Sequence, residues 1–306
     1  MEVIPIIPRG YCYGVVGAIQ LVRRVAADPS YPRPIQVLGQ IVHNRHVVEE
    51  LDRLGVVTLD GPDRRQLLDQ VRGGTVVFTA HGVSPAIREE AARRGLRVVD
   101  ATCPDVERTH DLVRRLVAEG YEVLYVGKRH HPEPEGVIGE APERVHLVES
   151  EADLEQLPPE VEKRLRSGPV AVTTQTTLSQ WDTQRVIRAI QARYPGVEVY
   201  NEICRATQTR QEAAVEAARE ADLVLVVGDR RSNNANRLVQ VVREVAGKPA
   251  YLIDDLDELQ PQWLRGARRV AVTAGSSTPS EITRRVIAWL KEQQPVPAEA
   301  GGGESR

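Results

Sequence analysis

The sequence predicts an α/β fold of three similar units with mainly parallel sheets, arranged pseudo-symmetrically around one central site. Short β-branched runs alternate with segments of helical periodicity along most of the 306 residues. The three cysteines of the chain, Cys12, Cys103 and Cys204, are 91 and 101 residues apart. Three kinds of strand end also recur once in each third of the chain, which is typical of an internal repeat.

The first kind of strand end places a cysteine. The runs VIPII, LRVVD and VEVYN lead into Cys12, Cys103 and Cys204. A segment with helical periodicity follows, such as VVGAIQLVRRVAAD after Cys12. Each cysteine is therefore expected where a strand gives way to a helix.

The second kind is a strand that ends in glycine, at Gly39, Gly127 and Gly228. Polar residues recur at matching offsets beyond these glycines. Four residues beyond lie His43, His131 and Ser232, and six residues beyond lie Arg45, Glu133 and Asn234.

The third kind is a strand that ends in threonine, at Thr79, Thr173 and Thr273. The residues that follow these strand ends are His81, then Thr176 and Thr177, then Ser276 and Ser277. A Ser, Thr or Pro that begins a helix comes next in all three copies.

The repeat also predicts the boundaries of the units. The first unit is expected over 13–102, the second over 103–200, and the third over 201–293 together with 1–12. The loops after the carboxyl ends of parallel strands hold ligands in such folds, so these polar residues are expected to converge. The tail 294–306 is rich in Pro, Gly and Glu and is predicted to be disordered. The stretch 157–169 is predicted to be an exposed connection.

Composition limits the class of protein. The net charge is −3, which gives no broad basic field for a nucleic-acid partner. No run approaches the length of a membrane span, and the first ten residues lack the features of a signal peptide, so a cytoplasmic location is expected. Charge runs such as RRQLLDQVR, residues 64–72, are interpreted as solvated helix faces.

Three widely spaced cysteines favour one metal centre over a disulfide framework. Structural zinc sites prefer four ligands, usually paired as C-x-x-C, and the chain has no such pair. Three thiolates suit a [4Fe–4S] cluster with one iron that lacks a protein ligand, and this reading is favoured over zinc by about two to one. Three unrelated buried thiols are the simpler alternative.

The repeated polar residues are mostly neutral donors, and together with helix N-termini they suit a phosphate or diphosphate. A role as helix caps accounts for serines such as Ser84 and Ser179, but not for two histidines, His43 and His131, at one repeat offset. Glu133 is the one carboxylate at its repeat offset and could deliver a proton near a metal centre. Its alternative role is that of a first-turn glutamate, for which Glu135 is the better candidate.

The motifs resemble a known family. GYCYGV, IVHN, AHGVSP, DATCP, HPExxG, QTTLS, NEICRAT, SNNANRL and TAGSSTP occur in this order between Gly10 and about Leu290. Together they resemble the 4-hydroxy-3-methylbut-2-enyl diphosphate reductases, the IspH/LytB family of the non-mevalonate isoprenoid pathway. The resemblance implies three pseudo-symmetric α/β units around a central iron–sulfur cluster.

The resemblance also implies roles for individual residues. The ligands of the [4Fe–4S] cluster fall on Cys12, Cys103 and Cys204. The diphosphate ligands fall on His43, His81, His131, Ser232, Asn234 and Ser277. The proton-delivering glutamate falls on Glu133, and the threonine beside the substrate hydroxyl falls on Thr176.

The implied reaction is a reductive dehydroxylation of the allylic diphosphate that yields isopentenyl and dimethylallyl diphosphate. Two electrons come singly from a donor such as a reduced ferredoxin or flavodoxin. Two alternatives use the same cluster: a dehydratase that needs no electron donor, and a non-enzymatic sensor of oxygen or iron. The chain departs from the family pattern at Gly17, Lys128 and Asn233, and the last of these lies in the diphosphate motif.

Overall fold

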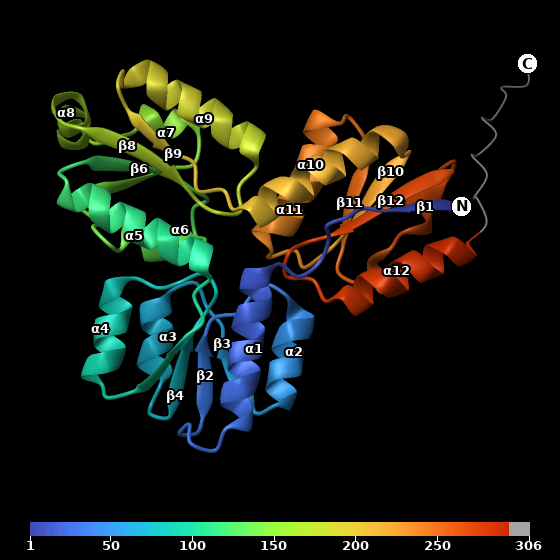
Figure 1. Cartoon of the computed structure of the whole chain (residues 1–306), viewed down its shortest axis with the longest axis horizontal. Helices are drawn as coiled ribbons and strands as arrows, with labels where there is room; N and C mark the ends of the chain where they lie inside the picture. Colours follow the sequence, from blue (N-terminus) through green and yellow to red (C-terminus); the bar gives the residue numbers. More distant parts are fainter. Residues whose placement is uncertain (294–306) are drawn as a thin grey trace, which may run out of the picture. The chain divides into compact units, whose positions relative to one another are not determined.

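The structure of the protein is a computed structural model that describes residues 1–293, so the predicted disordered tail 294–306 lies outside the described residues. The described chain alternates strands and helices and forms three four-stranded sheets, in which neighbouring strands pair in parallel. The predicted α/β class with three parallel sheets is therefore confirmed. Figure 1 shows the three sheets with their helices.

The chain divides into two compact lobes. The large lobe is Cys12–Thr207, and the small lobe is Met1–Tyr11 together with the chain from Gln208 onward. Two of the three sheets lie in the large lobe. The exact limits of the three predicted units stay a prediction.

The first sheet of the large lobe has the strand order β3-β2-β4-β5. Its strands are β2 (Ile35–Leu38), β3 (Val56–Leu59), β4 (Thr75–Phe78) and β5 (Arg97–Asp100), and its helices are α1 (Tyr13–Ala27), α2 (Arg45–Arg53), α3 (Arg64–Gln70) and α4 (Pro85–Arg93). Strands β2 and β4 are buried on both faces. Their near-continuous apolar sequences are typical of central parallel strands.

The second sheet of the large lobe has the order β7-β6-β8-β9. Its strands are β6 (Glu122–Val126), β7 (Val145–Val148), β8 (Val170–Thr174) and β9 (Glu198–Tyr200), and its helices are α5 (Pro104–Ala118), α6 (Pro132–Ile138), α7 (Glu151–Leu154), α8 (Pro159–Ser167) and α9 (Gln180–Arg193).

Helix α8 corrects the prediction that 157–169 is only an exposed connection. Val161 and Leu165 lie four residues apart on one face of the helix, and both are buried in the core beneath the sheet. Two apolar positions in a highly charged stretch are a weak periodic signal, which explains the error. Pro159 occupies the first helical turn, where its missing N–H does no harm.

The sheet of the small lobe has the order β1-β12-β10-β11. Its strands are β1 (Glu2–Pro5), β10 (Leu223–Val227), β11 (Ala250–Ile253) and β12 (Arg269–Ala274); the helices are α10 (Arg205–Glu220), α11 (Asn233–Val245) and α12 (Ser280–Glu292), with short 3₁₀ turns η1 (Leu256–Glu258) and η2 (Pro261–Leu264).

Strand β10 shows how the small lobe forms a three-layered core. Leu223 and Leu225 share a buried cluster with residues of α12, whereas Val224 and Val226 share another with residues of α10 and α11. Successive side chains of a strand point to opposite faces, so helices cover both sides of this sheet. None of the helices between residues 1 and 293 is both long and apolar enough to cross a bilayer.

Candidate active site

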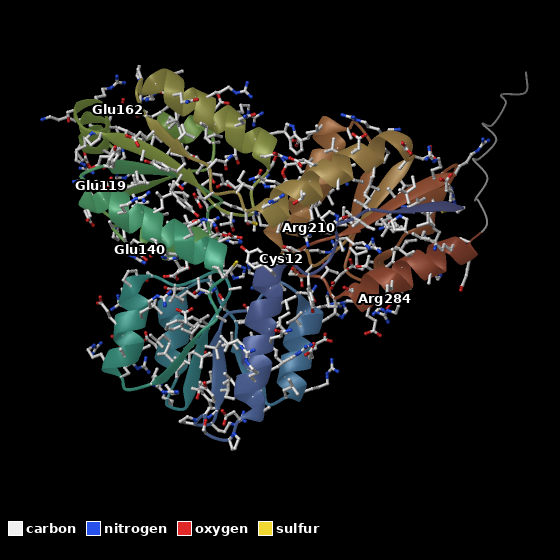
Figure 2. All side chains as sticks on the ribbon, in the orientation of Figure 1. Cys12, Glu119, Glu140, Glu162, Arg210 and Arg284 are labelled. Atoms are coloured by element: carbon white, nitrogen blue, oxygen red, sulfur yellow. The ribbon has the colours of Figure 1, made fainter. Side chains whose placement is uncertain are left out.

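Each cysteine lies at the start of a helix, as the strand-to-helix pattern predicts. Cys12 is the N-cap of α1 and Cys103 is the N-cap of α5, while Cys204 directly precedes α10. All three belong to the large lobe. Figure 2 shows Cys12 at the end of α1. Helix N-termini favour negative charge, which suits thiolate ligands.

The three thiols interact with one another. Burial raises the pKa of Cys103 to about 12 and also raises the pKa of Cys204, and the charge of Cys12 acts on both in the same direction. Without a metal, Cys103 and Cys204 are therefore neutral at pH 7, and the negative charge of a Cys12 thiolate would oppose their ionisation. The donor set fits a soft metal centre, because bound metal keeps cysteine ionised.

Gly14 leaves space for the Cys103 sulfur. A Cβ at residue 14 would lie 2.3 Å from Cys103 Sγ, far inside van der Waals contact. Thr207 Oγ1 lies 3.2 Å from Cys204 Sγ and completes the polar surroundings of that thiol. A side chain at residue 14 would therefore displace the Cys103 sulfur.

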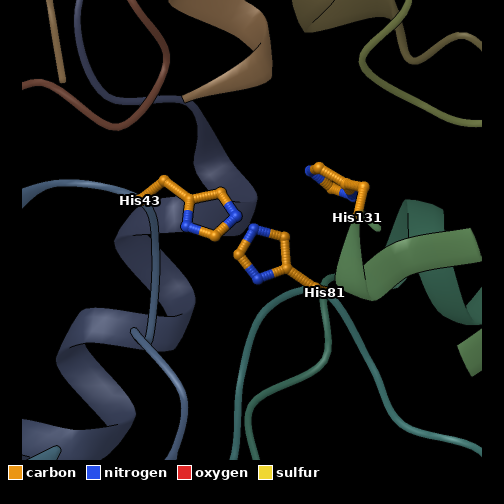
Figure 3. A group of neighbouring side chains, drawn as sticks. All are labelled: His43, His81 and His131. Carbon is orange, nitrogen blue, oxygen red and sulfur yellow. The ribbon is translucent and has the colours of Figure 1, made fainter. Parts of the chain in front are cut away.

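Three histidines converge within the large lobe (Figure 3). His43 follows β2, His81 follows β4, and His131 caps α6 after β6. The rings of His43 and His81 stack with centroids 4.3 Å apart, and His131 meets them edge-on at 5.5 and 5.4 Å. The sequence prediction that these strand-end loops come together is confirmed for these three residues.

The hydrogen bonding of His131 favours an anion over a metal ion. One possible ligand atom from each histidine lies within 4.8 Å of the others, a spacing that a metal ion also tolerates. However, the Glu133 N–H donates to His131 Nδ1 over 3.2 Å. Burial, with positive neighbours, lowers the pKa of His131 well below its usual value, so the ring is neutral and its proton lies on Nε2. An Nε2–H donor binds oxyanions and cannot ligate a metal.

A buried carboxyl lies in the first turn of the same helix. Glu133 is 1% exposed, and Thr176 donates to it twice, from its N to Oε1 over 2.7 Å and from its Oγ1 to Oε2 over 3.1 Å. Burial raises the pKa of Glu133 to about 7, against the lowering effect of the two Thr176 hydrogen bonds. Such a group exchanges protons near neutral pH, which suits general acid catalysis.

The small lobe brings its own predicted residues together. Ser277 Oγ lies 3.5 Å from Ser232 Oγ, and Asn234 Oδ1 accepts from the Ser276 N–H over 2.9 Å. Ser232 is the N-cap of α11 and accepts from the Ala235 N–H over 3.3 Å, so its role as a helix cap is real. All three predicted side chains, Ser232, Asn234 and Ser277, are buried. Their convergence with the histidines on one site stays a prediction.

Several neighbours of the histidines and cysteines escaped the sequence analysis. Tyr13 hydrogen-bonds to Asp105, and burial together with Asp105 raises its pKa above the usual range. Gln175 is fully buried, and its Oε1 accepts from the Lys128 N–H over 2.9 Å. A polar residue after β8 was the available signal for Gln175, whereas only the fold reveals the Tyr13 pair.

Arg64 corrects the interpretation of 64–72 as a solvated charge run. It lies at the start of α3 with 5% of its surface exposed, and its Nη2 donates to Thr79 Oγ1 over 3.0 Å. Its neighbour Arg65 is exposed, as predicted. The period of a helix this short does not distinguish the two arginines, so the sequence pattern could not find the buried one.

The three departures from the family pattern occupy different surroundings. Gly17 lies on the exposed face of α1, and a Cβ there would meet nothing within 4 Å. Lys128 is exposed, and its charge contributes to the lowered pKa of His131. Asn233 is buried in the first turn of α11 beside the Ser232 cap. Only Lys128 and Asn233 therefore lie close to predicted ligands.

This chain is similar to known proteins along nearly its whole length. A family model described as LytB protein matches residues 3–291. A protein of Symbiobacterium thermophilum named 4-hydroxy-3-methylbut-2-enyl diphosphate reductase is 63% identical over 292 residues, which cover 95% of this chain and 97% of that protein. A protein of the same name from Brevibacillus brevis is 58% identical, with 95% and 92% covered.

A solved structure is similar as well. The E-1-hydroxy-2-methyl-but-2-enyl-4-diphosphate reductase of Plasmodium falciparum superposes with a TM-score of 0.87 at 31% identity, covering 97% of this chain and 90% of that one. This chain and the solved structure therefore share the whole fold.

Proposed function

Since the chain belongs to the LytB protein family, we propose that it is a 4-hydroxy-3-methylbut-2-enyl diphosphate reductase that acts in the last step of the non-mevalonate pathway. The substrate loses its hydroxyl as water, takes up two electrons and two protons, and becomes isopentenyl or dimethylallyl diphosphate. The observation that carries this proposal is that one lobe holds three adjoining histidine rings together with a buried acid whose pKa is about 7.

Cys12, Cys103 and Cys204 are proposed to hold a [4Fe–4S] cluster with one iron that lacks a protein ligand. The electrostatic interaction of Cys12 with Cys103 and Cys204, and the space left by Gly14 for the Cys103 sulfur, support this assignment. When bound, the cluster supplies single electrons and Lewis acidity for cleavage of the C–O bond. The protein supplies the three thiols from the starts of three helices.

The histidine set His43, His81 and His131 is proposed to bind the substrate diphosphate. The neutral His131 ring, with its proton on Nε2, donates a hydrogen bond to a phosphate oxygen. The small lobe is proposed to add hydroxyl and amide donors from three buried residues, Ser232, Asn234 and Ser277. Neutral donors in buried surroundings bind an anion strongly because little water competes.

Glu133 is proposed to deliver the proton, and Thr176 to orient the substrate hydroxyl. The carboxyl is half protonated near pH 7, so it gives up a proton and recovers it at working pH. Thr176 fixes both oxygens of this carboxyl through two hydrogen bonds. This fixed geometry lets one carboxyl serve a single position of the substrate.

The electron donor, such as a reduced ferredoxin or flavodoxin, and the cytoplasmic location stay predictions. The allylic diphosphate is the proposed small-molecule partner.

The proposal is tested on protein purified without oxygen. Iron and sulfide are counted, and the allylic diphosphate is added with a strong one-electron reductant. About four irons and four sulfides per chain, with both five-carbon diphosphates as products, are expected. A full cluster whose turnover needs no reductant indicates a dehydratase, and a full cluster with no turnover indicates a sensor. Protein that binds no cluster after anaerobic reconstitution overturns the assignment of the cysteines.

A further inference from the structure

Arg64 is a buried positive charge whose position is not explained by the helix that carries it. Its side chain lies at the first position of α3 and is 5% exposed. Burial lowers its pKa to about 10, so it remains charged at neutral pH. Burying a guanidinium is unfavourable unless hydrogen bonds or an opposite charge compensate. Glu135 and Asp60 supply opposite charge near it, and each guanidinium N–H still requires a hydrogen-bond partner.

Part of the guanidinium lacks such a partner. Nη1 has no hydrogen-bond partner among the described residues. The guanidinium packs against Gly39 at the end of β2, where an added Cβ would lie 2.3 Å from Nη1. Gly39 itself has a φ of 90°, a conformation that glycine adopts without strain. The absence of a side chain at residue 39 thus admits the guanidinium beneath the loop that leads to His43.

Thr79 links Arg64 to His81. A guanidinium only donates, so Thr79 Oγ1 accepts the hydrogen bond from Arg64 Nη2. The hydroxyl of the fully buried Thr79 needs an acceptor of its own, and His81 Nδ1 lies 3.4 Å from Oγ1. Because the hydroxyl donates to Nδ1, the proton of the neutral ring lies on Nε2.

His81 and His131 therefore reach the same tautomer by different routes. In His131, the donor to Nδ1 is the Glu133 backbone N–H at 3.2 Å. In His81, it is a side-chain hydroxyl that is itself oriented by Arg64. The second route depends on two replaceable side chains, whereas the first depends on the backbone.

We propose that Arg64 is a positioning residue of the diphosphate site: through Thr79 it holds His81 as an Nε2–H donor, and its own charge attracts the anion. The inference rests on the proposed function, since it takes His81 as a diphosphate ligand. Arg64 does not itself touch the substrate in this assignment. A fixed charge in buried surroundings acts over several ångströms because water screens it little.

The tautomer of His81 is the direct readout. Imidazole nitrogens are followed by NMR on the ¹⁵N-histidine-labelled full chain, with the His81 signals assigned from a His81→Gln variant. The wild type is expected to show His81 protonated at Nε2. Thr79→Val keeps the shape of the side chain and removes the hydroxyl, so both tautomers of His81 are expected. An unchanged His81 tautomer in Thr79→Val overturns the inference.

Affinity for inorganic pyrophosphate, measured by calorimetry, is the second readout. Arg64→Met is expected to weaken binding by roughly 10- to 50-fold and Thr79→Val by roughly 3- to 10-fold. Arg64→Lys is expected to regain part of the loss, because it restores the charge. Arg65→Met, at the exposed neighbour, is the matched control and is expected to bind like the wild type. With substrate, KM is expected to rise while kcat changes little.

The outcomes separate this inference from the proposed function. If the wild type binds pyrophosphate and His81→Gln weakens it, the diphosphate role of His81 stands. Wild-type affinity in both Arg64→Met and Thr79→Val then overturns the inference alone. If the wild type does not bind pyrophosphate, or His81→Gln leaves its affinity unchanged, the site assignment and the inference both fall. If Arg64→Met does not fold, Thr79→Val decides the question.

Discussion

Thr176 contacts both oxygens of the Glu133 carboxyl, with its N–H 2.7 Å from Oε1 and its Oγ1 3.1 Å from Oε2. Both residues are almost fully buried, and the pKa of Glu133 is set by burial, the two Thr176 hydrogen bonds and the charge of Asp105, with no contribution from a basic side chain. Thr176 therefore orients the Glu133 carboxyl, while no neighbouring positive charge keeps that carboxyl ionised.

The first prediction concerns the proton. Glu133→Gln is expected to lower kcat by about 100- to 10,000-fold, because an amide cannot deliver a proton, while iron and sulfide contents stay unchanged. Glu119→Gln, at an exposed position at the end of α5, is the control and is expected to retain turnover. Steady-state kinetics under anaerobic conditions provide the measurement. Wild-type turnover in Glu133→Gln would contradict the proton role.

The second prediction concerns the pH dependence of turnover. The pKa of Glu133 is about 7, so the protonated fraction falls about tenfold per pH unit well above that value. The kcat of the wild type is therefore expected to decline as the pH rises above about 7 when proton delivery limits the rate. The profile is measured with the reductant held at a constant driving force. A kcat that stays flat up to pH 9 would exclude Glu133 as the rate-limiting acid.

The third prediction concerns stability. The folded-state pKa of Glu133 lies above its usual value of 4.5. Its contribution to the free energy of unfolding is therefore most favourable below about pH 4.5 and is lost as the pH rises through about 7. Glu133→Gln removes this penalty and is expected to stabilise the fold above pH 7, by at most about 3 kcal/mol. Urea unfolding at pH 5 and pH 9 measures the difference. An equal effect at both pH values would show that the carboxyl is not desolvated.

The fourth prediction compares two glycines of α1. Gly14→Ala places a Cβ 2.3 Å from Cys103 Sγ and is expected to reduce the iron bound per chain. Gly17→Ala meets nothing within 4 Å and is expected to stabilise the helix by about 0.5–1 kcal/mol with normal iron content. Iron and sulfide analysis and thermal unfolding measure the two effects. Full loading in Gly14→Ala would show that the pocket adapts to the added methyl group.

The fifth prediction concerns a buried ion pair behind the histidine loops. His110 Nδ1 lies 2.5 Å from Glu140 Oε1, and Arg114 donates to the same oxygen over 3.1 Å (Figure 2 labels Glu140). Burial alone would raise the pKa of Glu140, but His110 and Arg114 outweigh it and lower the pKa. The stabilisation is thus present above the usual pKa of a glutamate and is lost as the pH falls through the lowered value.

Glu140→Gln is therefore expected to destabilise the fold by roughly 1–3 kcal/mol at pH 7 and by less near pH 3. The exposed Glu119 at the end of α5 offers the control Glu119→Gln, which is expected to be near neutral. Denaturant unfolding at the two pH values measures both variants. A Glu140→Gln effect that is as large at pH 3 as at pH 7 would count against an ionised pair.

The sequence predicted the site best where polar residues directly follow the carboxyl end of a strand. The loops that carry His43, His81 and His131 come together because parallel strands align their carboxyl ends. Helix α8 was missed because its apolar face is only two residues wide. Arg64 was misread because burial of a charge depends on a distant partner, Thr79, and on the space left by Gly39. Long-range packing of this kind leaves no periodic signal in the local sequence.

Helix α6 carries His131 and Glu133 on one turn, and a hydrogen bond joins the Glu133 N–H to the His131 ring. Removing the imidazole therefore also removes the acceptor that fixes the backbone of the acid. Kinetic effects of changes at these two positions are expected to be non-additive, and a double-mutant cycle would report a coupling energy rather than two separate roles. A loss of proton transfer in a His131 variant therefore cannot be assigned to the imidazole alone, whereas Glu133→Gln keeps the backbone N–H and its bond to the ring.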